Sequence, residues 1–187
     1  MELVRPIPEH LASYIAALQQ GWSPDTTRGA DAAREALDKI EADPASPFAL
    51  VDDPDALGPP WKAPDGTMKA RLPGRVRWMW DADGFAGSIN LRWVHGSSEL
   101  PPYVLGHIGY SVVPWKRQRG YATRALGLLL PLARAEGLAH VDITTDPENE
   151  PSQKVILANG GVFVERFDKG PTWGHKPGFR YRIHLDR

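Results

Sequence analysis

The sequence predicts an α+β protein in which helices cover both faces of one mixed, mostly antiparallel sheet of about six to seven strands. Three observations predict it. Segments with helical spacing of apolar residues come first, alternating segments separated by short turns follow, and the last third alternates helix-like and strand-like patterns. With 187 residues, 42% of them hydrophobic, the chain suits one domain built around a sizeable core.

Two helices and a long loop are expected before the sheet. The first helix covers about residues 8–20 and stops at Gly21, and the second covers about residues 27–42. Residues 44–74 are rich in Pro, Gly and Asp, which indicates a long loop of the kind that either borders a binding site or is mobile. Too little chain precedes this loop for an independent domain. We therefore expect a single domain over residues 1–187, divided into residues 1–74 (helices and loop) and residues 75–187 (sheet and core).

The remaining elements follow from alternation and from turn residues. Asp83-Gly84 lies between two alternating runs, which predicts a β-hairpin, and Pro114 ends a further strand. The expected strands are 75–81, 85–94, 103–113, 139–145, 162–167 and 179–185. The expected helices in this half are 120–136 and 151–158.

Composition excludes several function classes. The chain has no cysteine, so disulfides, thiolate metal sites and a covalent thioester on the enzyme are ruled out. No histidine pair has the helical spacing of a zinc motif, and we expect no metal. The net charge of −1 and the absence of a basic block disfavour nucleic acid as a partner. Because no apolar run reaches the roughly 18 residues of a membrane span and no signal peptide is evident, no membrane association and a cytoplasmic location are expected.

The segment after the strand that ends at Pro114 has the chemistry of an anion site. Gly120 permits a close backbone approach, and the helix that starts there leaves its first N–H groups without intrahelical partners. These donors and the positive end of the helix dipole favour a bound anion, to which Lys116, Arg117 and Arg119 add charge. A diphosphate is the natural ligand of such a site, and an ordinary helix start with solvated basic residues is the alternative.

This segment resembles a known family. Arg117-x-x-Gly120-x-Ala122 is similar to the Q/R-x-x-G-x-G/A signature of the GCN5-related N-acetyltransferases, the GNAT superfamily. Residues 106–114 resemble the central strand of that family, residues 146–152 its loop before the second core helix, and residues 155–163 the end of that helix. The resemblance covers residues 76–167, and the sequences of these motifs are most similar to those of a bacterial branch of predicted acetyltransferases.

The resemblance implies a GNAT fold and acetyl-CoA, or another acyl-CoA, as co-substrate. It assigns pantetheine-binding backbone groups to Val112 and Val113, and pantetheine or cofactor contacts to Asn149 and Ser152. The expected diphosphate cradle consists of Arg117, Gln118, Arg119, Gly120, Tyr121, Ala122 and Thr123. Helix capping is the alternative role for Asn149 and Ser152, and core packing is the alternative for the two valines.

The chain departs from the family at the proton carriers. Many members place a tyrosine where this chain has Ile156, and a glutamate on the central strand, where no carboxylate occurs in Leu105-Gly106-His107-Ile108. His107 is a candidate base, because the pKa of an ordinary imidazole is about 6.5, close to neutrality. Tyr110 is a candidate proton donor. For both residues, a packed position in the strand is the alternative.

These patterns predict an N-acetyltransferase that moves an acetyl or other small acyl group directly to a primary amine, preferably of a small molecule. A non-catalytic acyl-CoA-binding sensor and a protein lysine or N-terminal acetyltransferase are the alternatives. Homodimerisation is possible. Among the 7 tryptophans, several are candidates for an aromatic acceptor pocket, although core packing is the simpler expectation: Trp22, Trp61, Trp78, Trp80 and Trp93.

Overall fold

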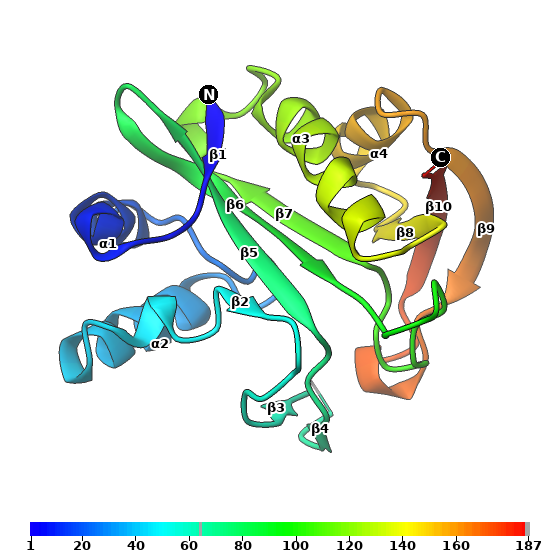
Figure 1. Cartoon of the computed structure of the whole chain (residues 1–187), viewed down its shortest axis with the longest axis horizontal. Coiled ribbons are helices and arrows are strands. Elements are labelled where there is room, and N and C mark those ends of the chain that lie inside the picture. The colour runs from blue at the N-terminus through cyan, green and yellow to red at the C-terminus, as the bar shows by residue number, and fades with distance from the viewer. Residues whose placement is uncertain (64, 186–187) are drawn as a thin grey trace.

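The computed structural model describes residues 1–63 and 65–185. Its helices lie on both sides of a central strand layer, with α1 and α2 against one face and α3 and α4 against the other (Figure 1). The helices are α1 (Leu11–Gln19), α2 (Ala30–Ala42), α3 (Tyr121–Ala135) and α4 (Glu150–Leu157). The short 3₁₀ helices are η1 (Pro8–His10), η2 (Ser46–Phe48), η3 (Pro114–Lys116) and η4 (Pro171–Trp173).

The strands form two main antiparallel sheets. The first has the order β1-β5-β6-β7 with β2 paired to β5, and the second has the order β8-β10-β9. These strands are β1 (Glu2–Val4), β2 (Asp52–Asp53), β5 (Gly74–Asp81), β6 (Gly84–Arg92), β7 (Ile108–Val112), β8 (His140–Thr145), β9 (Val162–Asp168) and β10 (Pro177–His184). A separate ribbon pairs β3 (Trp61–Lys62) with β4 (Met68–Lys69).

The predicted α+β fold, mostly antiparallel with helices on both faces, is confirmed. One difference is that the strands form two sheets, which are separated between β7 and β8. These two strands meet beside His107, whose N–H donates to the carbonyl of Asp142 at 2.7 Å. At this point Gly106 lies so close to β8 that an added Cβ would be 2.9 Å from the same carbonyl. Alternation along each strand does not encode whether two strands joined by a helix pair or diverge.

The strand expected over residues 103–113 is shorter than predicted. It begins at Ile108, because Pro101 and Pro102 belong to a turn in which the N–H of Val104 donates to the Pro101 carbonyl at 2.9 Å. The predicted hairpin is present as β5 and β6, with Asp81 paired to Gly84 at its turn.

Two hydrophobic clusters hold the layers together. On the α3 and α4 side, Ile89 and Leu91 of β6 pack with Leu126 and Leu129 of α3, all at 0–1% exposure. Because side chains alternate along a strand, Ser88, Asn90 and Arg92 of β6 point to the α1 and α2 side. An irregularity at Ala86 interrupts the alternation, so Phe85 also faces that side. There the second cluster includes Tyr14 and Trp22. Burial of these side chains is the main stabilising term of the fold.

The long segment between α2 and β5 is ordered by its own polar contacts. Asp53 is buried, and its carboxylate accepts the N–H groups of Leu57 at 2.8 Å and Gly58 at 3.0 Å. Further along, Asp65 accepts a hydrogen bond from the hydroxyl of Thr172 in η4 at 2.9 Å. The loop is therefore tied to the β9–β10 connection. No helix in the described ranges is long and apolar enough to cross a membrane.

Candidate functional site

Strand β7 presents an unpaired main-chain edge toward the gap beside β8. Next to the pairing of Leu91 with Ile108, the Arg92 N–H donates to the His107 carbonyl at 2.9 Å. The Val113 N–H likewise donates to the Ala86 carbonyl at 3.0 Å. Antiparallel pairing alternates, so the main-chain groups of the even-numbered residues 108, 110 and 112 point away from β6. An extended ligand can pair with such an edge as an added strand does.

This register separates the two valines of the predicted pantetheine site. Val112 points its N–H toward the open edge, whereas the N–H of Val113 is already used by β6. Both side chains are buried, as the core-packing alternative expects. The carbonyl of Val112 accepts a hydrogen bond from Nε of Arg117 at 3.2 Å.

The turn that leads from β7 into α3 has a conformation that suits an anion. Gln118 and Gly120 both have left-handed backbones, with φ of 59° and 75°. A Cβ added at Gly120 would find no atom within 4 Å, so the space beside this residue is open. The first intrahelical bond here runs from the Arg124 N–H to the Gly120 carbonyl, which leaves the amides of residues 121–123 without helical acceptors. The N-terminus of α3 is thus open at the place where the sequence predicts the cradle, and the binding of a diphosphate there stays a prediction.

The basic residues of this turn have different surroundings. Arg117 and Arg119 are exposed, as a role beside a diphosphate requires. The expectation that Lys116 adds charge to the cradle is not met, because its side chain is buried and its ammonium lies 2.6 Å from Asp81. Tyr121 also donates to Asp81, at 2.5 Å. Burial opposes ionisation of Asp81, but these two hydrogen bonds outweigh it and hold the pKa of the carboxyl below its ordinary value.

Tyr110 and Ser152, from opposite sides of the gap, are brought together. The Tyr110 phenol and the Ser152 hydroxyl are hydrogen bonded at 2.8 Å. Burial raises the pKa of Tyr110 to about 12. Ser152 also donates its N–H to the side-chain oxygen of Asn149 at 3.2 Å, so Asn149 caps α4 as the alternative reading expects. The capping bond leaves the amide NH₂ of Asn149 for another partner.

His107 has the surroundings of a structural residue. It is 0% exposed, and its Nδ1 accepts the Asp142 N–H at 2.9 Å. Burial lowers the pKa of the imidazole to about 4. Since Nδ1 already accepts a proton donor and the ring has no exposed surface, the geometry gives no support to His107 as the base.

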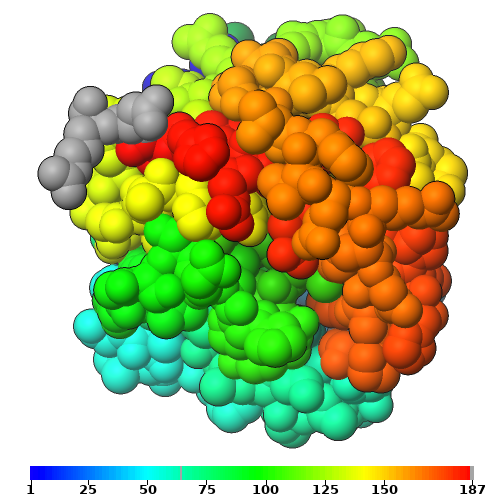
Figure 2. All heavy atoms as spheres, turned by 90° about the vertical axis from the view of Figure 1, so that its right-hand side faces the viewer, coloured from blue at the N-terminus to red at the C-terminus, as the bar shows by residue number. Residues whose placement is uncertain are grey.

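A cavity of about 300 Å³ lies on the α1 and α2 side of the sheet. Its floor includes Asn90 and Arg92 of β6, and its aromatic walls are Trp61, Tyr103 and Trp173. The walls come from the 44–74 loop, the segment before β7 and η4, which converge on the face of the molecule shown in Figure 2. Sequence reasoning missed Asn90 and Arg92. The signal was present, since both lie on one face of a strand whose other face is apolar.

Three of the five tryptophans considered for the acceptor pocket belong to the core. Trp22, Trp78 and Trp93 are at most 3% exposed, as the simpler expectation has it. Trp80 lies against His10, with ring centroids 4.3 Å apart, and Trp61 lines the cavity described above.

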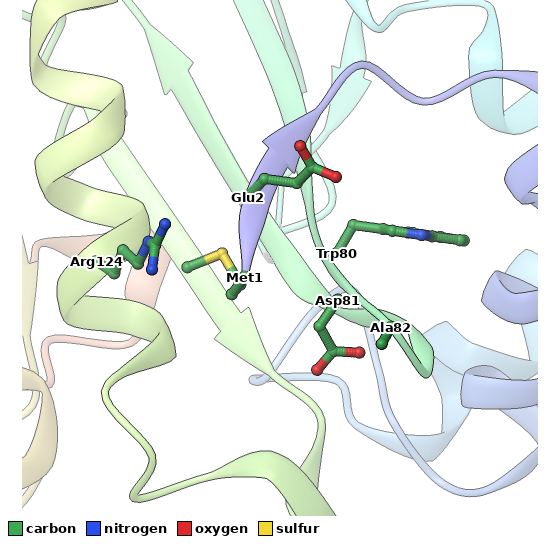
Figure 3. Close-up of a pocket in the computed structure, with 6 residues that line it drawn as sticks. All are labelled: Met1, Glu2, Trp80, Asp81, Ala82 and Arg124. Atoms are coloured by element: carbon green, nitrogen blue, oxygen red, sulfur yellow. The ribbon is translucent and has the colours of Figure 1, made fainter.

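A second hollow, of about 510 Å³, lies on the surface between α3 and β1 (Figure 3). Arg124 and Met1 point toward each other across it, while Trp80 extends away. It contains no residue of β7 or of the cradle, and we assign it no part in the reaction. Among the described residues, no group of three or more His, Asp or Glu side chains is placed to hold a metal ion.

An open strand edge that leads into a left-handed turn and an open helix N-terminus is the geometry that the expected coenzyme A site requires. The acetyltransferase (GNAT) domain model matches residues 3–162. The chain therefore belongs to the GNAT family of acetyltransferases, which take the acyl group from acetyl-CoA.

Solved structures agree on the fold. RimL, a ribosomal L7/L12 alpha-N-protein acetyltransferase in complex with coenzyme A, matches with a TM-score of 0.60 at 12% identity, over 98% of this chain and 93% of that one. The microcin C7 self-immunity acetyltransferase MccE, in complex with acetyl-CoA and AMP, matches with a TM-score of 0.57 at 12% identity, over 97% of this chain and 91% of that one. Spermidine N-acetyltransferase SpeG from Vibrio cholerae matches with a TM-score of 0.55 at 13% identity, over 99% of this chain and 95% of that one. Comparison with curated protein sequences gives no match.

Proposed function

We propose that this acetyltransferase moves the acetyl group of acetyl-CoA to a primary amine of a small molecule, by direct transfer within a ternary complex. Two open main-chain surfaces that follow one another along the chain carry the proposal. One is the edge of β7 that faces away from β6, with which no strand of the described ranges pairs, and the other is the first turn of α3, where the amides of residues 121–123 have no helical acceptor. Pantetheine amides can pair with the edge, and a diphosphate can accept from the helix amides. Exposed Arg117 and Arg119 supply the counter-charge.

The proposed binding residues divide into three groups along the coenzyme. Val112, with Asn149 and Ser152, faces the pantetheine arm, while Val113 contributes through packing. The main chain of residues 118–123 holds the diphosphate, and the Ser152 hydroxyl positions Tyr110. All of these residues belong to β7, to the N-termini of α3 and α4, or to the turns before those helices.

In the proposed reaction, the amine nitrogen bonds to the acetyl carbon as the carbon–sulfur bond breaks. The leaving thiolate takes a proton from the Tyr110 phenol, and the amine releases its proton to water. Because the pKa of Tyr110 is about 12, the phenol stays protonated at neutral pH and is suited to donate. With no cysteine in the chain, an acyl-enzyme thioester has no place in this scheme.

A small acceptor is favoured by the size and the walls of the cavity near β7. About 300 Å³ suits a small molecule, and the 44–74 loop, tied to η4 through Asp65 and Thr172, restricts the approach of a protein chain. The SpeG match concerns a small polyamine and the RimL match a protein, so the comparisons contain both classes.

The cradle is tested by Gly120→Glu, with Gly137→Glu as its matched control. Both glycines have positive φ, 75° and 83°, both have open space where a Cβ would lie, and they flank opposite ends of α3. Backbone strain is therefore similar, of the order of 1–3 kcal/mol. Only the change at residue 120 puts negative charge where the diphosphate is expected. Calorimetry should show acetyl-CoA affinity lost in Gly120→Glu and retained in Gly137→Glu. Equal affinity in the two folded variants would contradict the cradle.

Turnover separates an enzyme from a binding module. Released coenzyme A thiol can be read with a thiol reagent without protein background, because the chain has no cysteine. Thiol release that depends on an added small amine supports the proposed function. Tight acetyl-CoA binding without release on any amine would favour the non-catalytic module, and release only with peptides would favour a protein acceptor.

A further inference from the structure

The guanidinium of Arg92 lies in the cavity of about 300 Å³ described above, and no carboxylate of the described residues pairs with it. Its side chain donates to Asn90 at 2.7 Å, and no ion pair joins it to any residue in ranges 1–63 and 65–185. Burial lowers the pKa of the guanidinium from its ordinary value. A desolvated guanidinium carries five donors, so the single bond to Asn90 leaves most of them for a ligand.

The other polar groups of the cavity also offer donors rather than acceptors. The indole N–H of Trp173 is buried and has no acceptor among the described residues. Within ranges 1–63 and 65–185, the side chain of Arg71 donates to the Pro59 carbonyl alone, at 3.1 Å. Asp53 is the one carboxylate among the described residues of the wall, and it already accepts two loop amides. Arg75 is neutralised by Glu136 and Asp52, at 2.6 and 3.3 Å. The cavity therefore has an excess of positive charge and of unused donors, and both favour the binding of an anion.

Arg92 also lies beside the strand at which the reaction is proposed. A Cβ built on Gly109 of β7 would be 3.2 Å from the Arg92 guanidinium and 3.4 Å from the Asn90 side chain. Gly109 directly precedes Tyr110, so the Arg92 guanidinium lies beside β7 one residue along the strand from the proposed acid. Glycine at residue 109 leaves room on this face of the strand, because a larger side chain would fill the space over the guanidinium.

We infer that the acceptor is an amino acid, whose carboxylate binds Arg92 while its neighbouring amine faces the open edge of β7. The inference rests on the proposed function and deepens it. The planar guanidinium suits a carboxylate, which it can bind in a forked arrangement. Trp61, Tyr103 and Trp173 form the remaining walls, so we expect an apolar or aromatic side chain on the amino acid.

The test compares three amines with one ring: L-phenylalanine, L-phenylalaninamide and 2-phenylethylamine. Thiol release gives kcat/KM for each with wild type, Arg92→Gln, Arg92→Lys and the control Arg134→Gln, an exposed arginine of α3. The ratio of wild type to variant cancels the intrinsic reactivity of each amine. We expect Arg92→Gln to lower kcat/KM for phenylalanine about 10- to 100-fold through KM, and to change the other two less than about threefold. Arg92→Lys should recover part of the loss, and Arg134→Gln should match wild type.

A binding measurement keeps the inference testable apart from catalysis. 3-Phenylpropionate has the ring and the carboxylate but no amine, so it cannot be acetylated. Calorimetry with the coenzyme A-bound protein should detect its binding in wild type and a loss of at least about tenfold in Arg92→Gln. Binding that depends on Arg92, without turnover of any amine, would refute the proposed function and support the anion site. Turnover of phenylalaninamide that equals that of phenylalanine, with both insensitive to Arg92, would overturn the inference and leave the proposed function in place.

Discussion

Ile156 is fully buried in the α3 and α4 cluster and has no proton to give, although many relatives have a tyrosine at the matching position. A phenol from another element reaches the same helix. Tyr110 reaches across from β7 to Ser152, one helical turn before Ile156. Tyr110, the acid we propose, therefore lies on a different element from the tyrosine expected in the family but contacts the same helix.

Tyr110→Phe tests whether Tyr110 donates the proton to the leaving thiolate. Removal of the phenol should lower kcat by roughly 10²- to 10⁴-fold with little change in KM, because a general acid acts in the transition state. Wild-type activity should not decline up to about pH 10 through this residue, since the pKa of its phenol is about 12. Tyr14→Phe, which removes a buried hydroxyl in the other cluster, is the control. Equal kcat for both variants would mean that the thiolate leaves without help from Tyr110.

His107 illustrates the opposite outcome at the residue scale. The sequence offers an imidazole near the expected reaction centre, but alternation cannot tell which hydrogen bonds the ring makes. Those bonds depend on Asp142, 35 residues further along the chain. A polar residue in a strand is therefore a weak guide to catalysis until its partners are known.

At the scale of elements, the N-terminus of α4 combines two roles that the sequence left as alternatives. The Asn149 side-chain oxygen caps the helix through the Ser152 N–H, while its NH₂ group is free to donate to a ligand. The capping role is observed, and the cofactor role stays a prediction.

Two substitutions separate these roles. Asn149→Asp keeps the capping oxygen and loses the donor, so stability should stay within about 0.5 kcal/mol of wild type while acetyl-CoA binds more weakly. Asn149→Ala loses both and should lower the free energy of unfolding by about 1 kcal/mol. Urea unfolding and calorimetry measure the two effects. If Asn149→Asp binds acetyl-CoA as tightly as wild type, Asn149 is a cap and no more.

At the scale of the whole molecule, the contact between the two sheets should make stability depend on pH. His107 lies at this contact, and burial lowers the pKa of its ring from 6.5 to about 4 in the folded state. Between these two pH values the unfolded chain binds more protons than the folded protein. The contribution of His107 to the free energy of unfolding is therefore fully present above pH 6.5 and declines as the pH falls toward 4. The decline from this residue is at most about 3 kcal/mol. Asp142, paired with Arg182 at 2.7 and 2.9 Å, acts at lower pH, because its lowered pKa starts from 3.8.

Urea titrations at pH 7.5, 5.5 and 4.5 check this expectation. His107→Gln, which can still accept the Asp142 N–H, should be less stable at pH 7.5 but should lose less stability on acidification. His95→Gln, at an exposed histidine, should follow wild type. A pH slope unchanged by His107→Gln would show that other groups cause the decline.

The sequence by itself determined the fold class and most of the helices and strands, and it pointed to the residues proposed for the coenzyme site, because these depend on local signals. Alternation defines strands, Gly120 and the residues before it define the helix start, and the cradle consists of neighbours in the chain. Only the tertiary structure led to the proposals for the acceptor side and for the acid. Arg92 lies beside Gly109 and lines the same cavity as Trp173, and Tyr110 is hydrogen bonded to Ser152, each from a different element. Contacts between distant segments depend on how the sheets diverge and how the loops close, and side-chain periodicity within one segment does not encode either.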